Sequence, residues 1–199
     1  MNERGQTGIA GIDFSITCPC VCVFDFDFVD KFEFNKCKFY FLIKKKKWDA
    51  EVGSEQFQGE QHKEFTSQEE RFNNITNFTI NKLWELEKIF IEGYSFGSVG
   101  QVFNIAENTG VLKNKFFNLD ISFDIIAPSV IKKYATGKGN ADKEKMYESF
   151  VKETKCDLLK IFDVSKLQNP ITDIVDSYYI TKLGYDREKN LESIKSDKS

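Results

Sequence analysis

The sequence lacks several features that would each have indicated a class of protein. It has no secretory signal and no apolar run of membrane-spanning length, so we expect a cytoplasmic protein that does not enter a membrane. Its one histidine, His62, and its cysteines do not have the spacing of a zinc site. Its net charge of -3 gives no global attraction to nucleic acid, so such a partner would have to be held by local basic patches.

Two lysine-rich segments supply candidate patches. One is the run Lys44–Lys47, and the other spans residues 132–145, a segment that contains five lysines and only two acidic residues. The five cysteines are an odd number in a chain without a secretory signal, so we expect reduced thiols. Cys18, Cys20 and Cys22 alternate along one expected strand, and we interpret them as small apolar strand residues rather than metal ligands.

The length of 199 residues and the hydrophobic content of 41% suit one domain with its own core. We place this domain at residues 1–185, with a charged, loop-like insertion around residues 44–65. The charged residues 186–199 are predicted to be a disordered tail. The acidic, Lys- and Phe-rich composition would suit a phage protein acting in a host cytoplasm.

The hydrophobic periodicity predicts a mixed order of strands and helices. Three antiparallel strands within residues 8–43 come first, and Lys44–Gln61 is read as a loop. There follow a helix at about 66–86, a strand at 88–94, a helix at 98–113, a buried strand at 121–127, and helices at 130–134, 142–160 and 171–183, with Gly184 ending the last one. This order predicts an α/β fold, a mixed sheet with helices on its faces.

The first strand carries a carboxylate in an apolar setting. Ile9, Ala10, Ile12 and Phe14 are typical of a buried central strand, and Asp13 lies among them. A buried carboxylate has to be neutralised, hydrogen-bonded or bound to a cation. The alternative is an aspartate at a strand end that caps the following turn.

Three further carboxylates lie in separate segments that the fold could bring to Asp13. Glu92 ends the expected strand 88–94, and Asp173 and Asp176 are three residues apart on the last helix, so they share a face. If that helix lies over the first strand, the four acids converge as a site for Mg²⁺ or Mn²⁺. Considered singly, Asp173 could instead be a structural residue, because the helix dipole stabilises a carboxylate in the first turn. Glu92 could likewise be a surface residue at a strand end.

Five segments, in order, resemble the RuvC family of Holliday junction resolvases within the ribonuclease H-like superfamily. They are GIDFS, FIEGYSFG, SVGQVFNIAENTGVLK, TGKGNADKEKM and ITDIVDSYYI, and together they span most of residues 8–184. Residues 137–143 are the most specific of these, because paired carboxylates recur in many unrelated proteins. The segment around residues 45–65 departs from the family by being longer and more charged.

The resemblance implies a ribonuclease H-like sheet and cleavage of branched DNA, such as a four-way junction, by a homodimer. It implies that Asp13, Glu92, Asp173 and Asp176 hold two Mg²⁺ ions, for which Mn²⁺ can substitute. It also implies that Lys132, Lys138 and Lys143 contact DNA, Lys143 within the catalytic centre. The helix 98–113, with apolar Val99, Val102, Phe103 and Ala106, is the expected dimer interface.

Three other readings start from the same residues. GIDFS also resembles the first phosphate loop of the sugar-kinase and actin superfamily, but a second domain of similar size would not fit in this chain. A module that binds branched DNA without cutting would have no need to keep four acids together. A ribonuclease H-type nuclease acting on RNA–DNA hybrids is the nearest enzymatic rival, and only the Gly137–Lys143 resemblance separates it from a resolvase.

Overall fold

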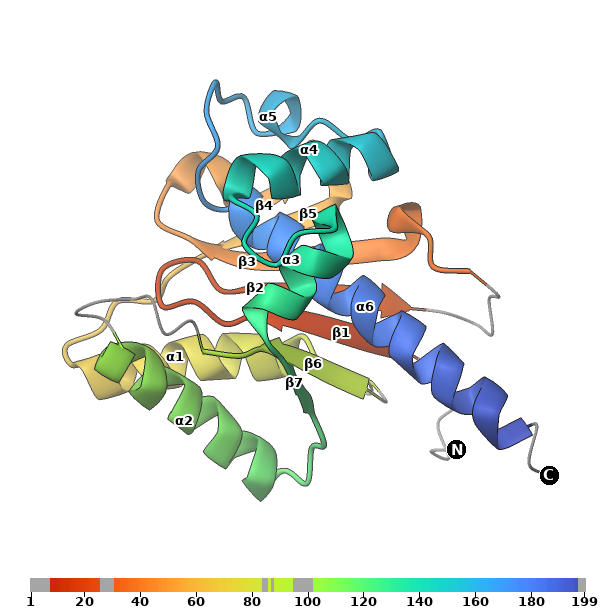
Figure 1. Ribbon diagram of the computed structural model, residues 1–199. Coiled ribbons are helices and arrows are strands. Elements are labelled where there is room, and N and C mark those ends of the chain that lie inside the picture. Colours follow the sequence, from red (N-terminus) through yellow and green to blue (C-terminus); the bar gives the residue numbers. More distant parts are fainter. Residues whose placement is uncertain (1–7, 26–30, 84–85, 87, 95–101, 197–199) are drawn as a thin grey trace.

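A computed structural model describes residues 8–25, 31–83, 86, 88–94 and 102–196, with side chains through residue 190 (Figure 1). The described strands form one sheet, in the order β4-β5-β3-β2-β1-β6-β7. The strands are β1 Gly8–Asp13, β2 Cys20–Asp25, β3 Cys37–Ile43, β4 Ala50–Val52, β5 Ser54–Gln61, β6 Lys88–Glu92 and β7 Asp124–Ile126. The α-helices are α1 Gln68–Asn81, α2 Val102–Asn118, α3 Pro128–Thr136, α4 Lys143–Thr154, α5 Leu158–Ile161 and α6 Ile171–Ser196, and two 3₁₀ turns are η1 Phe34–Lys36 and η2 Lys46–Trp48.

Five strands of this sheet run in the same direction. β6 is parallel to β1 and β7 to β6, while β2 is antiparallel to both β1 and β3, and β5 is parallel to β3. The carboxyl ends of β1, β3, β5, β6 and β7 therefore share one edge, which we call the carboxyl edge. Asp13 and Glu92 are the last residues of their strands and both lie there.

Helices cover both faces of the sheet, as expected for the predicted α/β fold. Ile9 of β1 and Phe90 of β6 pack with α6 and α4, whereas Ala10 and Ile12 pack with residues of α1 and α2 on the other face. Because side chains alternate along a strand, Asp13 shares the face of Ile9, and Glu92 shares the face of Phe90. Both carboxylates consequently point to the side of the sheet that α6 covers.

Two glycines allow α6 to lie against the sheet. A Cβ on Gly11 of β1 would overlap the Thr181 backbone nitrogen and would lie 2.8 Å from the Ser177 carbonyl oxygen. A Cβ on Gly184 of α6 would overlap the Phe90 ring of β6. Gly184 was predicted to end the last helix, and this is wrong: the glycine lies inside α6, which continues to Ser196.

The first half of the chain departs from the sequence prediction in the third strand and in the segment after it. The third of the three antiparallel strands was predicted at 32–43, but β3 begins at Cys37, because Phe34–Lys36 forms a 3₁₀ turn. The second was predicted at 20–28, and its residues 26–28 lie outside the described part. The predicted loop Lys44–Gln61 contains β4 and β5, which extend the sheet beyond β3. The helix predicted at about 66–86 is confirmed as α1, whose N-cap Ser67 accepts a hydrogen bond from the Glu70 amide.

The second half differs in element lengths. The predicted buried strand 121–127 is the short edge strand β7, whose Ile125 is 50% exposed. The predicted helix 142–160 divides into α4 and α5, because Lys155 adopts a left-handed conformation with a φ of 60°. Residues 186–196 are helical in α6 rather than a disordered tail. None of the described helices is long and apolar enough to cross a membrane.

Candidate active site

The structure places the four predicted acids around the start of α6 at the carboxyl edge. Ser177 and Thr181 lie against Gly11, so the preceding turns of α6 extend over Asp13, two residues further along β1. Asp173 and Asp176 are on those turns. Asp13 and Asp173 are 9% and 4% exposed, so both carboxyls are inside the protein rather than at a solvated strand or helix end.

Burial and mutual repulsion act on all four carboxyls. Burial raises the pKa of Asp13 well above its usual value, and the charges of Asp173, Glu92 and Asp176 raise it further. Burial, followed by the charge of Asp176, raises the pKa of Glu92 to about 7. Four acids from β1, β6 and α6 are therefore close enough to act on one another, as the sequence predicts.

The two helix acids show the same effect, moderated by lysines. Burial raises the pKa of Asp173 to about 7 and that of Asp176 to about 6. The ammonium group of Lys143 opposes the rise at both, and Lys132 opposes it at Asp176.

Lys132 and Lys143 lie where their charges reach the acids, and Lys138 does not share this position. Lys143 is the first residue of α4, and its Nζ donates to the Thr172 hydroxyl at 3.2 Å, one residue from Asp173. Lys132 on α3 lowers the pKa of both Glu92 and Asp176. Lys138 is exposed in the turn that follows α3, which ends at Gly137 with a φ of 79°.

Two polar residues that were not predicted as site residues hold Asp173. The Asn169 amide donates to one carboxylate oxygen at 3.2 Å, and the Thr172 hydroxyl contacts the other at 3.4 Å. Asn169-Pro170 could be read from the sequence only as the start of a helix, since an asparagine before a proline carries no specific signal for contact with a carboxylate. These two side chains fix the rotamer of Asp173.

The acids suit a hard cation by their chemistry but are not arranged as ligands in this structure. Carboxylate oxygens are the donors that Mg²⁺ and Mn²⁺ prefer, and four mutually repelling carboxyls, two of them buried and two half-buried, are stabilised by a cation among them. Among the described residues, no three Asp, Glu, His or Cys side chains lie close enough to hold one ion as they stand. Binding would thus require rotation of side chains such as Asp173 away from their present partners.

The cysteines take no part in this donor set. Cys18, Cys20 and Cys22 lie in the core on the α6 side of the sheet. Burial raises the pKa of each thiol, which keeps it protonated and unsuited to metal binding. The Ser177 hydroxyl on α6 contacts the Cys20 sulfur at 3.2 Å, so this cysteine helps to seat the helix that carries two of the acids.

Comparison of the fold with solved structures identifies its type. The structure of Thermus thermophilus RuvC matches with a TM-score of 0.57 and 15% sequence identity, over 92% of this chain and 96% of that one. The chain has a RuvC-like fold. The T. thermophilus RuvC structure in complex with Holliday junction substrate matches with a TM-score of 0.56 and 16% identity, again over 92% and 96% of the two chains.

A eukaryotic protein shares the RuvC-like fold. The yeast mitochondrial Holliday junction resolvase matches with a TM-score of 0.51 and 15% identity, over 87% of this chain and 75% of that one. No family model and no curated protein sequence matches this chain. The RuvC-like fold is therefore recognised by structure, at sequence identities too low to carry an activity across.

Proposed function

We propose that this protein is a metal-dependent endonuclease that cleaves Holliday junctions or other branched DNA. The observation that carries the proposal is the group of four mutually repelling acids, two buried and two half-buried, contributed by β1, β6 and α6, with Lys132 and Lys143 within electrostatic reach. The RuvC-like fold supports it, since matching structures include a RuvC bound to Holliday junction substrate. A structural ion-pair network would instead contain about as many buried cations as acids.

In this proposal Asp13, Glu92, Asp173 and Asp176 would hold two Mg²⁺ ions, or Mn²⁺ in their place. Bound at such a site, the metal would supply charge for the attacking water and for the leaving 3′ oxygen in a phosphodiester hydrolysis that yields a 5′ phosphate. The ammonium group of Lys143, at the mouth of the site beside Thr172, would bind the backbone phosphate of the strand to be cut. Lys132 would contact the same strand from α3, and Lys138 a neighbouring phosphate.

A homodimer would place two such sites on the two symmetric strands of a four-way junction. We assign the interface to α2, because Val102 and Phe103 are 38% and 82% exposed there, and Phe117 near its other end is 83% exposed. Large apolar side chains in solvent mark association surfaces. Val99, the first residue of the predicted interface, lies outside the described residues. Light scattering should give twice the mass of 23.1 kDa.

The direct test is a gel assay of the purified protein on four substrates of equal length. A four-way junction, a flap, a linear duplex and an RNA–DNA hybrid are each incubated with Mg²⁺ and with chelator. We expect paired nicks in the junction with Mg²⁺ only. Preferential cutting of the hybrid would instead make the protein a ribonuclease H, and tight junction binding with no cutting in any metal would make it a binding module.

A further inference from the structure

The carboxyl edge continues beyond the four acids to the ends of β3 and β5. β3 is the second neighbour of β1 in the sheet and β5 is the third, and both run parallel to β1. Lys44 follows the end of β3, and His62 and Lys63 follow the end of β5. We call these three residues the strand-end cluster; they belong to the segment 44–65, which was predicted to be a charged, loop-like insertion.

Contacts tie this cluster to the loop that directly follows Asp13. The His62 ring nitrogen Nε2 lies 2.8 Å from the Thr17 carbonyl oxygen, and Arg71 of α1 donates to the Ile16 carbonyl at 3.0 Å. Burial lowers the pKa of His62, and the positive charges of Arg71 and Lys44 lower it further, so these groups are within electrostatic reach of one another. The cluster and the candidate active site are therefore attached to the same short loop.

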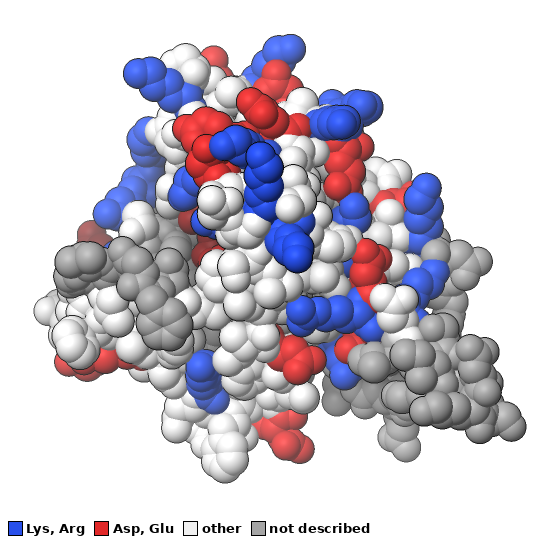
Figure 2. Space-filling view, in the orientation of Figure 1, with Lys and Arg blue, Asp and Glu red and all other residues white. Residues whose placement is uncertain are grey.

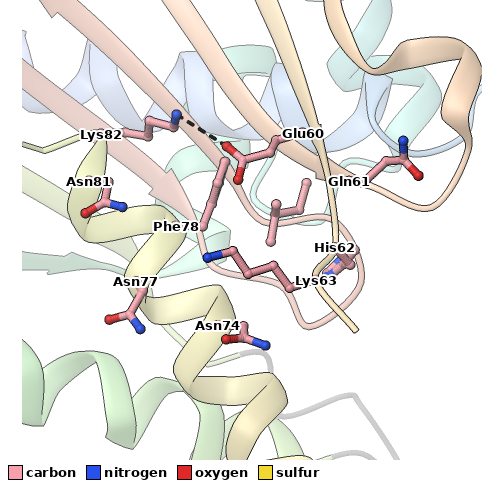
Figure 3. A pocket seen from close by; sticks show the side chains of 10 residues that line it. Glu60, Gln61, His62, Lys63, Asn74, Asn77, Phe78, Asn81 and Lys82 are labelled. Carbon is pink, nitrogen blue, oxygen red and sulfur yellow. Dashed lines mark ion pairs between the residues drawn. The ribbon is translucent and has the colours of Figure 1, made fainter. Parts of the chain in front are cut away.

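The cluster adjoins a polar pocket with an excess of positive charge. Figure 3 shows Lys63 beside the row Asn74, Asn77 and Asn81 on α1, facing the end of β5. The acid in this pocket, Glu60, is paired with Lys82 at 3.5 Å. Neither Lys44 nor Lys63 forms an ion pair with any residue that the structure describes, so both ammonium groups are free to bind an anion.

The position of the cluster favours a nucleic acid over other anionic partners. Lys132 on α3 acts on Glu92 of β6 and so flanks the acids on the β6 side, whereas the strand-end cluster flanks them from the β3–β5 side. In Figure 2, Lys and Arg side chains gather along the left-hand edge of the molecule, where β3 and β5 end in Figure 1. A polyanion that crosses the acids would meet positive charge on both sides.

We propose that the strand-end cluster is a second phosphate-binding site, which holds the DNA arm leading away from the cut. This inference rests on the proposed nuclease function. Two to three strand spacings of about 4.8 Å separate the cluster from Asp13, which gives about 10–14 Å along the edge. At about 3.4 Å per base pair, Lys44 and Lys63 contact phosphates about three to four positions from the scissile one.

The first test measures junction binding against salt concentration, in chelator so that no strand is cut. Each phosphate contact contributes about 0.9 to the slope of log K against log salt on duplex DNA, so Lys44→Ala with Lys63→Ala should lower the slope by about 1.8. The matched control is Lys31→Ala with Lys36→Ala, two exposed lysines that precede β3 at the opposite edge of the sheet. That control should leave the slope unchanged, and Lys44→Arg with Lys63→Arg should restore the wild-type slope.

The second test locates the contact. A single neutral methylphosphonate three to four positions from the cut should weaken binding by the wild type and leave the Lys44→Ala, Lys63→Ala variant unaffected. If this variant equals the Lys31→Ala, Lys36→Ala control, or if arginine fails to restore the slope, the second site does not exist, although wild-type junction cutting would still uphold the nuclease. If the wild type neither binds nor cuts branched DNA, both proposals fail.

Discussion

The two faces of the sheet are packed in opposite ways. On the α6 face, glycines at positions 11 and 184 remove side chains from the contact, and the space near the carboxyl edge contains four acids. On the other face, α1 and α2 pack through ordinary apolar side chains such as Ile75, Phe78 and Leu112. Close backbone packing on this face leaves α6 little room to shift, as would be required of a helix that carries half of the proposed catalytic site.

The largest difference between the faces should appear in activity. Asp13→Asn keeps the size of the side chain and removes one charge from the α6 face, so junction cleavage should fall by more than about 100-fold while junction binding persists. A quantitative gel assay and a binding titration on the same protein measure the two effects. Retained cleavage in Mg²⁺ would remove Asp13 from the site.

The packing difference itself can be tested with a glycine on each face. Gly11→Ala inserts a methyl group against the backbone of Ser177 and Thr181, which should cost about 1–3 kcal/mol of unfolding free energy or more. Gly110→Ala on α2 meets nothing within 4 Å and should stabilise by about 0.5–1 kcal/mol through helix propensity. Urea unfolding of both variants provides the comparison, and equal effects would mean that α6 can shift without cost.

The acids should also make stability depend on pH when metal is absent. Their folded pKa values lie above the unfolded values near 4, at about 7 for Glu92 and Asp173 and about 6 for Asp176, so the folded state binds more protons between these limits. Stability in chelator should be complete near pH 4, decline as pH rises, and level off above about pH 7. Thermal melts at intervals of pH measure this; a melting temperature that rises over the same range would contradict the burial of these groups.

The smallest expected effect belongs to a single lysine at the mouth of the site. Lys143→Ala should slow cleavage and reduce the salt slope of junction binding by about 0.9, since one phosphate contact is lost. Lys132→Ala should act in the same direction. Binding titrations at several salt concentrations measure the slope, and a gel assay measures the cleavage rate. If Lys143→Ala changes neither of them, Lys143 is a solvated helix residue.

The sequence predicted the parts of the molecule in which local pattern and tertiary role agree. Asp13 in an apolar strand and Glu92 at a strand end were found because each stands at the boundary of a strongly patterned element. The convergence of the four acids followed from placing the last helix over the first strand. Gly11 then explains why that placement is possible.

The incorrect or missed predictions concern residues whose structure is decided by tertiary contacts rather than by the local sequence. β5, with the sequence SEQFQGEQ, has almost no apolar alternation, and it forms a strand because β3 supplies a partner on its open side. Glycine is common at helix ends, which is why Gly184 was predicted to be one. In the structure the position has to be glycine because a Cβ there would overlap the Phe90 ring of β6. Asn169 and Thr172 were missed because their role depends on the rotamer of Asp173, which no spacing in the sequence reveals.

The central claim is that the four acids form a cation site, and a melting experiment with one double variant tests it most directly. Wild type and Asp173→Asn with Asp176→Asn are melted in chelator and in increasing Mg²⁺. Because a cation bound only to the folded state stabilises by RT ln(1 + [L]/Kd), wild type should gain about 2.7 kcal/mol at a hundred times Kd. The double variant should be more stable than wild type in chelator and gain much less from Mg²⁺. A wild type indifferent to metal, together with a double variant less stable in chelator, would show that the two aspartates are structural.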